Sequence, residues 1–547
     1  MSEAIRPRLA LGVGIGLVLV LALLLRAPIA AMPLERDEGG YAYISLEWLG
    51  GALPYRDAFD QKPPAIYLAY LVLLRFFGST PEAIHWGTQA YTCLTLILLA
   101  WLGTRFFSPV GGVAASAMAA YLTTHPYLLG NSSNTEIFML LPLAGMALAC
   151  LFAMEGGAWG FSLLAGLLGG ACALFKQVAL VQAGFFFLLV AWRATPRWRH
   201  LAAFIAGGML PIVLTWIYFW NAGAGQEFVD AVFGYNLLYA TRVPFSLYPV
   251  LFKNTFVPIL LSAWPLLALA SLGLVSLGRS FPKESGAPAG GAPGGLFLSG
   301  WLLFAFVATS VSGYYRKHYF IQMIPPVTLL AALGAVRLAH AVPRARWRST
   351  LVFLVVAAAI TFGLGKEWWY YGPATPWAKS RHLYGINPFA ESMEVARFIA
   401  DGSRPDERVF IYGSEPQILF YANRKSASRY IYVYPLLAPV PGSLERQRAA
   451  LGELSKRPPR FIVVTHVYAS FLTAPDSPLA LLFGLQELLR RGYHVVGAVP
   501  FEFGEATSLV TGEEARRIRE RKPSWKEDEA CCSLVIWERN AGAGGGL

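Results

Sequence analysis

Long apolar runs without charged side chains dominate the first two thirds of the chain. Each run is close to the ~20 residues that an α-helix needs to cross a bilayer, and the shortest of them covers 177–192. The pattern therefore predicts a polytopic α-helical membrane protein with about 11 transmembrane helices. These helices are expected at 9–25, 86–104, 109–130, 137–154, 158–175, 177–192, 200–220, 254–278, 296–315, 319–336 and 349–365.

The pattern changes near residue 366, beyond which short apolar strands alternate with amphipathic helical segments. Such alternation is typical of an α/β domain. We therefore expect a transmembrane domain at 1–366 and an extracytoplasmic α/β domain at 367–547, with a disordered Gly-rich tail after Asn540. Strands are expected at 408–412, 461–465, 493–499 and 533–538, and helices at 389–401, 443–456 and 478–491.

Basic residues set the orientation, because Lys and Arg collect in cytoplasmic loops. If the basic N-terminus is cytoplasmic, the Arg-rich loops near 105, 193–199, 279–283 and 344–348 share its side. The odd number of spans then places the C-terminal domain outside. The apolar segment 63–78 is short and begins with two prolines, so we expect a helix lying on the outer interface. Because Arg26 interrupts the approach to any cleavage site, the first helix is expected to stay uncleaved.

Composition excludes several classes of protein. Hydrophobic residues make up 55% of the 547 residues and charged residues 14%, with a mean hydropathy of +0.47. Soluble domains carry about 25% charged residues, so an ordinary soluble enzyme, a disordered scaffold and a usual nucleic-acid binder are all excluded. The net charge of +12 is accounted for largely by cytoplasmic loops. Five cysteines in a chain of this size do not make a disulfide framework.

Five polar clusters interrupt the apolar pattern, at 35–41 (ERDEGGY), 55–64 (YRDAFDQKPP), 131–136 (NSSNTE), 175–177 (FKQ) and 314–319 (YYRKHY). Each has a structural explanation: acids cap helices, cations snorkel, and aromatic residues form belts at the interface. Under the predicted orientation, however, all five clusters fall on the outer side. Ionisable residues at a membrane are costly and are therefore candidate functional sites.

Together the clusters predict a cavity that opens outward. Carboxylates can accept the proton of a hydroxyl nucleophile, and cations with phenols and an imidazole suit phosphate and sugar recognition. No nucleotide-sugar pool exists outside the cell, so an activated sugar must arrive on a membrane lipid. The candidate residues are Asp37, Glu38, Tyr41, Lys62, Asn134, Glu136, Lys176, Arg316, Lys317, His318 and Tyr319, with Arg242 of the long loop 221–250 added from its position alone.

Four segments carry a resemblance to a known family: 36–44 (RDEGGYAYI), 60–64 (DQKPP), 134–138 (NTEIF) and 318–326 (HYFIQMIPP). In their order and topology they resemble the bacterial protein-mannosyltransferase-like family. That family belongs to the GT-C glycosyltransferases and is related to the aminoarabinose transferases that modify lipid A. The resemblance covers roughly residues 9–366, and no single motif would suffice.

The resemblance implies roles for single residues. Asp37 would be the catalytic base and Glu38 its partner. Lys62, in the Lys-Pro-Pro motif, would contact the polyprenyl phosphate. Glu136 corresponds to an acid of the third outer loop, and His318 with Tyr319 to an outer His-Tyr pair. Family members of this type also carry an outer α/β domain, which agrees with the expectation for 367–547.

The implied reaction is an inverting transfer of a sugar from a polyprenyl-phosphate donor to a glycan, lipid or protein hydroxyl. The phosphate would leave with its charge held by Lys62 and the group at 316–318. No cofactor is expected, because no spacing of ligating residues makes a metal site; a divalent ion beside Asp37, Glu38 and Glu136 is the alternative.

A transporter or flippase of a lipid-linked or small polar substrate is the main rival, and a structural assembly protein is a third reading. A transporter predicts paired halves and charges at mid-membrane. The sequence has no internal repeat, and its polar clusters lie at one face. A glycosyltransferase in the bacterial inner membrane, with a cytoplasmic N-terminus, is the reading that we favour.

Overall fold

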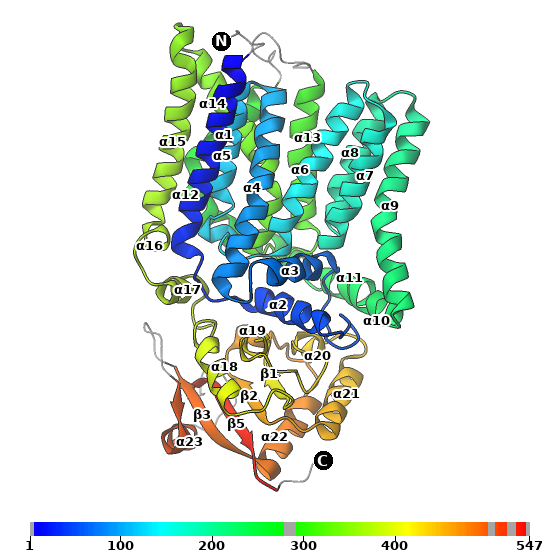
Figure 1. Ribbon diagram of the computed structural model, residues 1–547, viewed down its shortest axis with the longest axis vertical. Coiled ribbons are helices and arrows are strands. Elements are labelled where there is room, and N and C mark those ends of the chain that lie inside the picture. The colour runs from blue at the N-terminus through cyan, green and yellow to red at the C-terminus, as the bar shows by residue number, and fades with distance from the viewer. Residues whose placement is uncertain (1–4, 278–291, 502–508, 522–531, 543–547) are drawn as a thin grey trace.

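The computed structural model describes residues 5–277, 292–501, 509–521 and 532–542, so most of the predicted Gly-rich tail lies outside the described residues. A bundle of long helices forms one end of the molecule and a sheet with flanking helices forms the other (Figure 1). Two further helices lie crosswise between these parts. The N-terminal end of the first helix is at the end of the bundle farthest from the sheet.

The bundle helices coincide with the apolar runs of the sequence. Among the described residues, six helices are long and apolar enough to cross a membrane by length and composition. The protein is thus a multi-pass membrane protein, while the full count of 11 crossings stays a prediction. The bundle contains α1 (Ile5–Arg26), α4 (Pro81–Phe106), α5 (Pro109–Leu122), α6 (Thr135–Met154), α7 (Trp159–Phe175), α8 (Ala179–Arg193), α9 (Arg197–Asn221), α12 (Tyr248–Val275), α13 (Ala292–Ser310), α14 (Ile324–His340) and α15 (Arg348–Lys366).

Two of these helices differ from the predicted runs because of proline. The run expected to reach residue 130 ends at Leu122, and a 3₁₀ turn at Pro126–Leu128 follows. The run expected to begin at 319 starts instead as a 3₁₀ segment, Lys317–Met323, and α14 begins only afterwards. Prolines occupy the first turn of α14, where the missing N–H costs no hydrogen bond.

Small residues allow close packing inside the bundle. A Cβ atom at Gly166 or Gly170 of α7 would collide with the carbonyl oxygen of Phe204 or Gly208 on α9. Only glycine therefore lets these two backbones approach each other so closely, which is a usual device for helix association in lipid.

The crosswise helices are α2 (Arg36–Leu49) and α3 (Ala65–Phe76). The position of α3 agrees with the helix expected at 63–78. Both helices share a hydrophobic core with the C-terminal part: Tyr41 and Ile66 belong to the same cluster of buried residues as Ile411 and Leu419. The bundle has a core of its own. The division predicted at residue 366 marks the end of α15, but the hydrophobic cores do not follow it.

The C-terminal part is a mixed sheet with the strand order β1-β2-β5-β3-β4, in which β1 and β2 are parallel and the other pairs antiparallel. The four predicted strands correspond to β1, β2, β3 and β5, and the three predicted helices to α18, α21 and α22. The strands are β1 (Val409–Tyr412), β2 (Phe461–Thr465), β3 (Tyr493–Pro500), β4 (Val510–Thr511) and β5 (Cys532–Arg539). The helices after α15 are α16 (Trp368–Tyr371), α17 (Pro376–Tyr384), α18 (Glu391–Asp401), α19 (Gln417–Ala422), α20 (Tyr434–Leu437), α21 (Ser443–Lys456), α22 (Ala480–Gly492) and α23 (Gly512–Arg521), while α10 (Gly225–Val229) and α11 (Asn236–Ala240) precede α12.

Candidate active site between the helical bundle and the sheet

The first turn of α2 is fixed by its own acidic residues. Glu35 is the N-cap, and its carboxylate accepts hydrogen bonds from the backbone N–H groups of Asp37 and Glu38, at 3.0 and 3.2 Å. The Glu38 carboxylate accepts in return from the backbone N–H of Glu35 at 3.2 Å. This reciprocal arrangement is a capping box. The capping explanation for this cluster therefore holds for Glu35 and Glu38, whereas Asp37 takes no part with its side chain.

Glu38 is fully buried, and both oxygens of its carboxyl group have hydrogen-bond partners. Its Oε1 atom accepts from the backbone N–H of Ser133 at 2.6 Å and lies 3.0 Å from Nε2 of His85. With the capping bond on Oε2, three hydrogen-bond partners surround this carboxyl group. Glu38 thus lies directly beside Asp37 in the chain, but its oxygens are directed into the protein.

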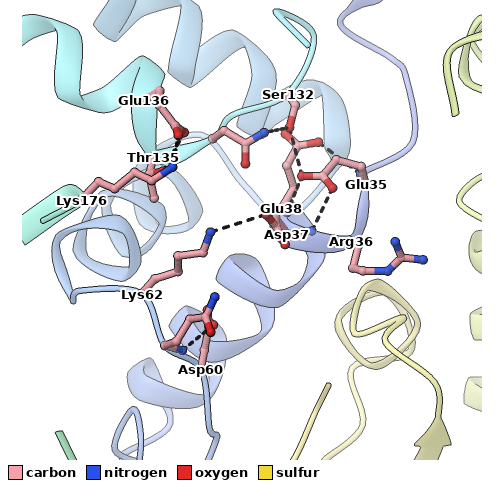
Figure 2. A network of polar contacts seen from close by, with 12 residues as sticks. Glu35, Arg36, Asp37, Glu38, Asp60, Lys62, Ser132, Thr135, Glu136 and Lys176 are labelled. Carbon is pink, nitrogen blue, oxygen red and sulfur yellow. Dashed lines mark hydrogen bonds and ion pairs between the residues drawn. The ribbon is translucent and has the colours of Figure 1, made fainter. Parts of the chain in front are cut away.

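Asp37 lies opposite Lys62, which reaches toward it from the loop before α3 (Figure 2). The Lys62 Nζ atom is 3.7 Å from Oδ2 of Asp37, and the two side chains keep 15% and 29% of their surface exposed. Burial is the largest single effect and opposes ionisation of Asp37, but the attraction of Lys62, His318 and Arg36 together outweighs it and lowers the pKa of Asp37 below its ordinary value. Asp37 is therefore an ionised and accessible carboxylate at neutral pH.

The neighbouring carboxyl of Glu35 behaves in the opposite way. Burial and the negative charges of Asp37 and Glu38 raise the pKa of Glu35 to about 8. Two carboxyl groups whose environments move their pKa values apart have separate tasks. The oxygens of Glu35 are taken up by the N–H groups of the cap, and the ionised Asp37 suits proton acceptance.

Aromatic residues and one further acid support Lys62. Its backbone carbonyl accepts from the Tyr55 hydroxyl at 2.9 Å, and its ammonium lies 5.9 Å from the centre of the Tyr41 ring. Asp60 is buried, and its carboxyl accepts from the Tyr67 hydroxyl at 2.8 Å. Burial raises the pKa of Asp60 to about 6, although Lys62 and Tyr67 oppose the rise. The Tyr41 hydroxyl is buried without a hydrogen-bond partner among the described residues.

Glu136 and Lys176 form a second carboxylate–ammonium pair, from the start of α6 and the end of α7 (Figure 2). The Glu136 carboxylate is fully buried and also accepts from the Thr135 hydroxyl at 2.8 Å. The Lys176 ammonium lies 3.4 Å from the centre of the Tyr319 ring, which is a cation–π contact. Asn134 precedes Thr135 and Glu136 in the chain and is buried. Its side-chain amide donates to the Ser132 hydroxyl at 2.9 Å.

The cluster at 314–319 divides between two surroundings. His318 is buried with its ring against Tyr319 and within electrostatic reach of Asp37. Arg316 is exposed, and its guanidinium lies 5.5 Å from the centre of the Tyr314 ring. The Lys317 ammonium lies 5.7 Å from the centre of the Tyr127 ring.

A ladder of phenols joins this cluster to the long loop before α12. Tyr314 stacks on Tyr239 at 4.6 Å between ring centres, and the Tyr239 hydroxyl is 3.5 Å from that of Tyr319. Arg242 acts electrostatically on Tyr314, which places it at the far end of the ladder. The structure thus brings Asp37, Lys62, Glu136, Lys176, His318 and Tyr319 together, and it places Arg242, Arg316 and Lys317 further out.

The C-terminal part contributes residues that sequence patterns did not single out. Arg36 donates to the backbone carbonyl of Ser414 at 2.6 Å and to the Glu415 carboxylate at 2.5 Å. A Cβ at Gly40 would collide with the hydroxyl of Tyr432, and one at Gly39 with Gln417. Gly39 and Gly40 therefore allow the C-terminal part to pack closely against α2. His85 was missed as well, because a single histidine in an apolar run carries no sequence signal.

The described residues contain no group of three or more His, Cys, Asp or Glu side chains placed to hold a metal ion. Asp37 and Glu136 each face a lysine ammonium instead. A cation beside these carboxylates would have to displace a positive charge from each of them. The donor set is therefore a poor fit to the divalent ion considered from the sequence.

The fold can be compared with those of known proteins. No protein-family model matches the chain, and no curated protein sequence matches it either. The crystal structure of ArnT from Cupriavidus metallidurans bound to undecaprenyl phosphate matches with a TM-score of 0.62 at 15% identity, over 97% of this chain and 98% of that one. The apo state of ArnT matches with a TM-score of 0.59, the same identity and the same coverage.

This chain has the GT-C fold. The oligosaccharyltransferase of Archaeoglobus fulgidus in complex with Zn and sulfate is less similar, with a TM-score of 0.47 at 14% identity over 90% of this chain and 73% of that one. Near-complete coverage by ArnT means that the GT-C fold extends over both the bundle and the sheet. At 15% identity the fold is what the two chains share, so the role of each residue has to be argued from the contacts of this chain.

Proposed function

We propose that the protein is a membrane glycosyltransferase that transfers a sugar from a polyprenyl-phosphate donor to an acceptor hydroxyl. The observation that carries the proposal is the Asp37–Lys62 pair, an ionised, partly exposed carboxylate 3.7 Å from a lysine ammonium. The other carboxylates nearby are engaged: Glu35 caps α2, Glu38 has three hydrogen-bond partners, and Glu136 is paired with Lys176. ArnT, which shares the fold, has been crystallised with undecaprenyl phosphate, and this supports a lipid-phosphate donor.

In the proposed reaction, Asp37 accepts the proton of the acceptor hydroxyl while the hydroxyl oxygen attacks the anomeric carbon. A new glycosidic bond forms, the bond from that carbon to the phosphate oxygen breaks, and the configuration inverts. The lipid phosphate leaves with the bonding electrons. Lys62, together with the exposed Arg316, offsets the charge that develops on it.

The proposal includes the location of the protein. The enzyme would lie in the bacterial inner membrane with a cytoplasmic N-terminus, so that α2 and the sheet face the outside. There the donor is a lipid-linked hexose or pentose, and the acceptor is a glycan, lipid or protein hydroxyl of the cell envelope, lipopolysaccharide included.

The test is transfer of label from a panel of radiolabelled polyprenyl-phosphate sugars by the purified full chain, with membrane acceptors present. Asp37→Asn keeps the shape and removes the base, so turnover should fall by about 10²- to 10⁴-fold, while binding of polyprenyl phosphate persists. Asp57→Asn is the matched control, because Asp57 lies in the nearby loop before α3 and pairs with the exposed Arg56. Near-normal turnover by Asp37→Asn would remove Asp37 from its role. A wild-type chain that neither transfers sugar nor binds polyprenyl phosphate would favour a transporter.

A further inference from the structure

His85 is fully buried on α4, and both of its ring nitrogens face oxygen atoms. Nδ1 is 2.7 Å from the backbone carbonyl oxygen of Ala30, which follows α1. Nε2 is 3.0 Å from Oε1 of Glu38. A carbonyl oxygen only accepts, so Nδ1 carries a hydrogen. The contact between Nε2 and Oε1 then joins the ring to the carboxyl group of Glu38.

Glu38 transmits this anchorage to the first turn of α2. One of its oxygens is held by His85 and by the backbone N–H of Ser133, and the other closes the capping box with Glu35. Because both of its oxygens are engaged by buried partners, Glu38 is not available to take a proton from a substrate. Asp37 lies between the two capping residues, so the direction of its carboxylate follows from the geometry of this turn.

We propose that His85 is a positioning residue for Asp37, an inference that rests on the proposed function. His85 ties the ends of α1 and α4 to Glu38, and Glu38 fixes the turn that aims Asp37 at Lys62. The acidic pair of the sequence therefore has divided roles: Asp37 meets the substrate, and Glu38 holds the helix through His85.

Three variants test the role through turnover, counted per molecule that binds polyprenyl phosphate. His85→Phe keeps the ring and loses both hydrogen bonds; kcat should fall on the order of 10²-fold, as expected for a small misplacement of a reacting group. The KM for the donor lipid should stay near the wild-type value, since Lys62 is untouched. His85→Gln, whose amide nitrogen can reach the Glu38 oxygen as a neutral donor, should restore most of the loss.

The control is Thr88→Val, on the same face of α4 three residues later. The Thr88 hydroxyl contacts that of Ser133 at 2.8 Å and does not touch Glu38. This variant should lower thermal stability without lowering kcat. A wild-type kcat in His85→Phe, or an equal loss of kcat in Thr88→Val and His85→Phe, would overturn the positioning role.

Hydrogen exchange of the peptide that contains 36–49 gives a readout that needs no activity. Exchange should be faster in His85→Phe than in the wild type and slow again in His85→Gln. If the wild type transfers no sugar but exchange follows this order, the proposed function fails and the anchorage by His85 stands. Unchanged exchange in His85→Phe rejects the anchorage itself.

Discussion

The site contains two carboxylate–ammonium pairs that have the same chemistry and differ in geometry. Asp37 and Lys62 are 3.7 Å apart, and both keep part of their surface exposed. Glu136 and Lys176 are in direct contact, the carboxylate fully buried and the ammonium covered by the Tyr319 ring. Figure 2 shows Lys62 directed toward Asp37, and Lys176 toward Glu136.

The difference supports the role proposed for the Asp37–Lys62 pair. A long, partly exposed contact leaves both groups able to bind a substrate atom, so Asp37 can accept a proton while Lys62 turns to a phosphate. In a short, buried contact both charges are already paired. Separating them would leave an unpaired buried charge and would destabilise the folded protein. The Glu136–Lys176 pair therefore fastens α6 to α7, and the Asp37–Lys62 pair is available for the reaction.

The largest difference should appear on removing the lysine of the open pair. In Lys62→Met the burial of Asp37 is no longer opposed by Lys62, so its pKa rises. The acidic limb of kcat/KM should move to higher pH by roughly 1 to 3 pH units, the usual effect of one close opposite charge, and donor binding should weaken. The pH profile of turnover measures this. Arg56→Met, a cation lost from the same loop, is the control and should leave the limb in place; an unmoved limb in Lys62→Met would contradict the coupling.

A smaller effect on turnover is expected from Glu136→Gln, which instead costs stability. Lys176 is left buried without its partner, which typically destabilises a fold by roughly 3–5 kcal/mol. Thermal unfolding in detergent should show this loss, and adding Lys176→Met should recover much of it, because no unpaired charge remains. Turnover per folded molecule should stay close to wild type. If Glu136→Gln abolishes turnover as Asp37→Asn does, the distinction between the two pairs is wrong.

The smallest effect on turnover is expected from Asp60→Asn. Asp60 also lies near Lys62, but burial raises its pKa to about 6, so the folded protein binds a proton that the unfolded chain releases near pH 4. Stability from this group is present at low pH and is lost as pH rises through 6. Asp60→Asn should flatten the dependence of Tm on pH between about 4 and 6. The prediction is contradicted if the Tm of the wild type rises with pH over this window and that rise is absent in Asp60→Asn. Asp60 would then stabilise the fold in its ionised form.

Local patterns predicted most of the elements. Apolar length located the bundle helices, and Pro63-Pro64 marked the start of the short helix α3. Strand β4, two residues long, was missed because so short an element has no period. The antiparallel placement of β5 between β2 and β3 was also out of reach, because pairing depends on contacts distant in sequence.

The candidate site was predictable only in part. Charge in an apolar chain is costly, so Asp37, Lys62 and Glu136 were visible from the sequence. His85 was not, because a single histidine carries no sequence signal and its partner Glu38 lies 47 residues away in the chain. Glu415 and Tyr432 were hidden for another reason: in the polar C-terminal part, an acid or a tyrosine is ordinary. The pairing of Lys62 with Asp37 and of Lys176 with Glu136 required the fold.

The hydrophobic core that α2 shares with the sheet has a consequence for chimaeric enzymes. An engineer who exchanges C-terminal parts between GT-C chains to alter the acceptor would also exchange the surface beneath the helix that carries Asp37. Grafts that join at residue 366 but lack Glu415, Gln417 and Tyr432 would remove the carboxylate partner of Arg36 and the side chains that cover Gly39 and Gly40. An exchange that keeps this contact therefore has to include α2, the loop 50–64 and α3 together with the sheet. These two parts are distant in the chain, since α3 ends at Phe76 and β1 begins at Val409.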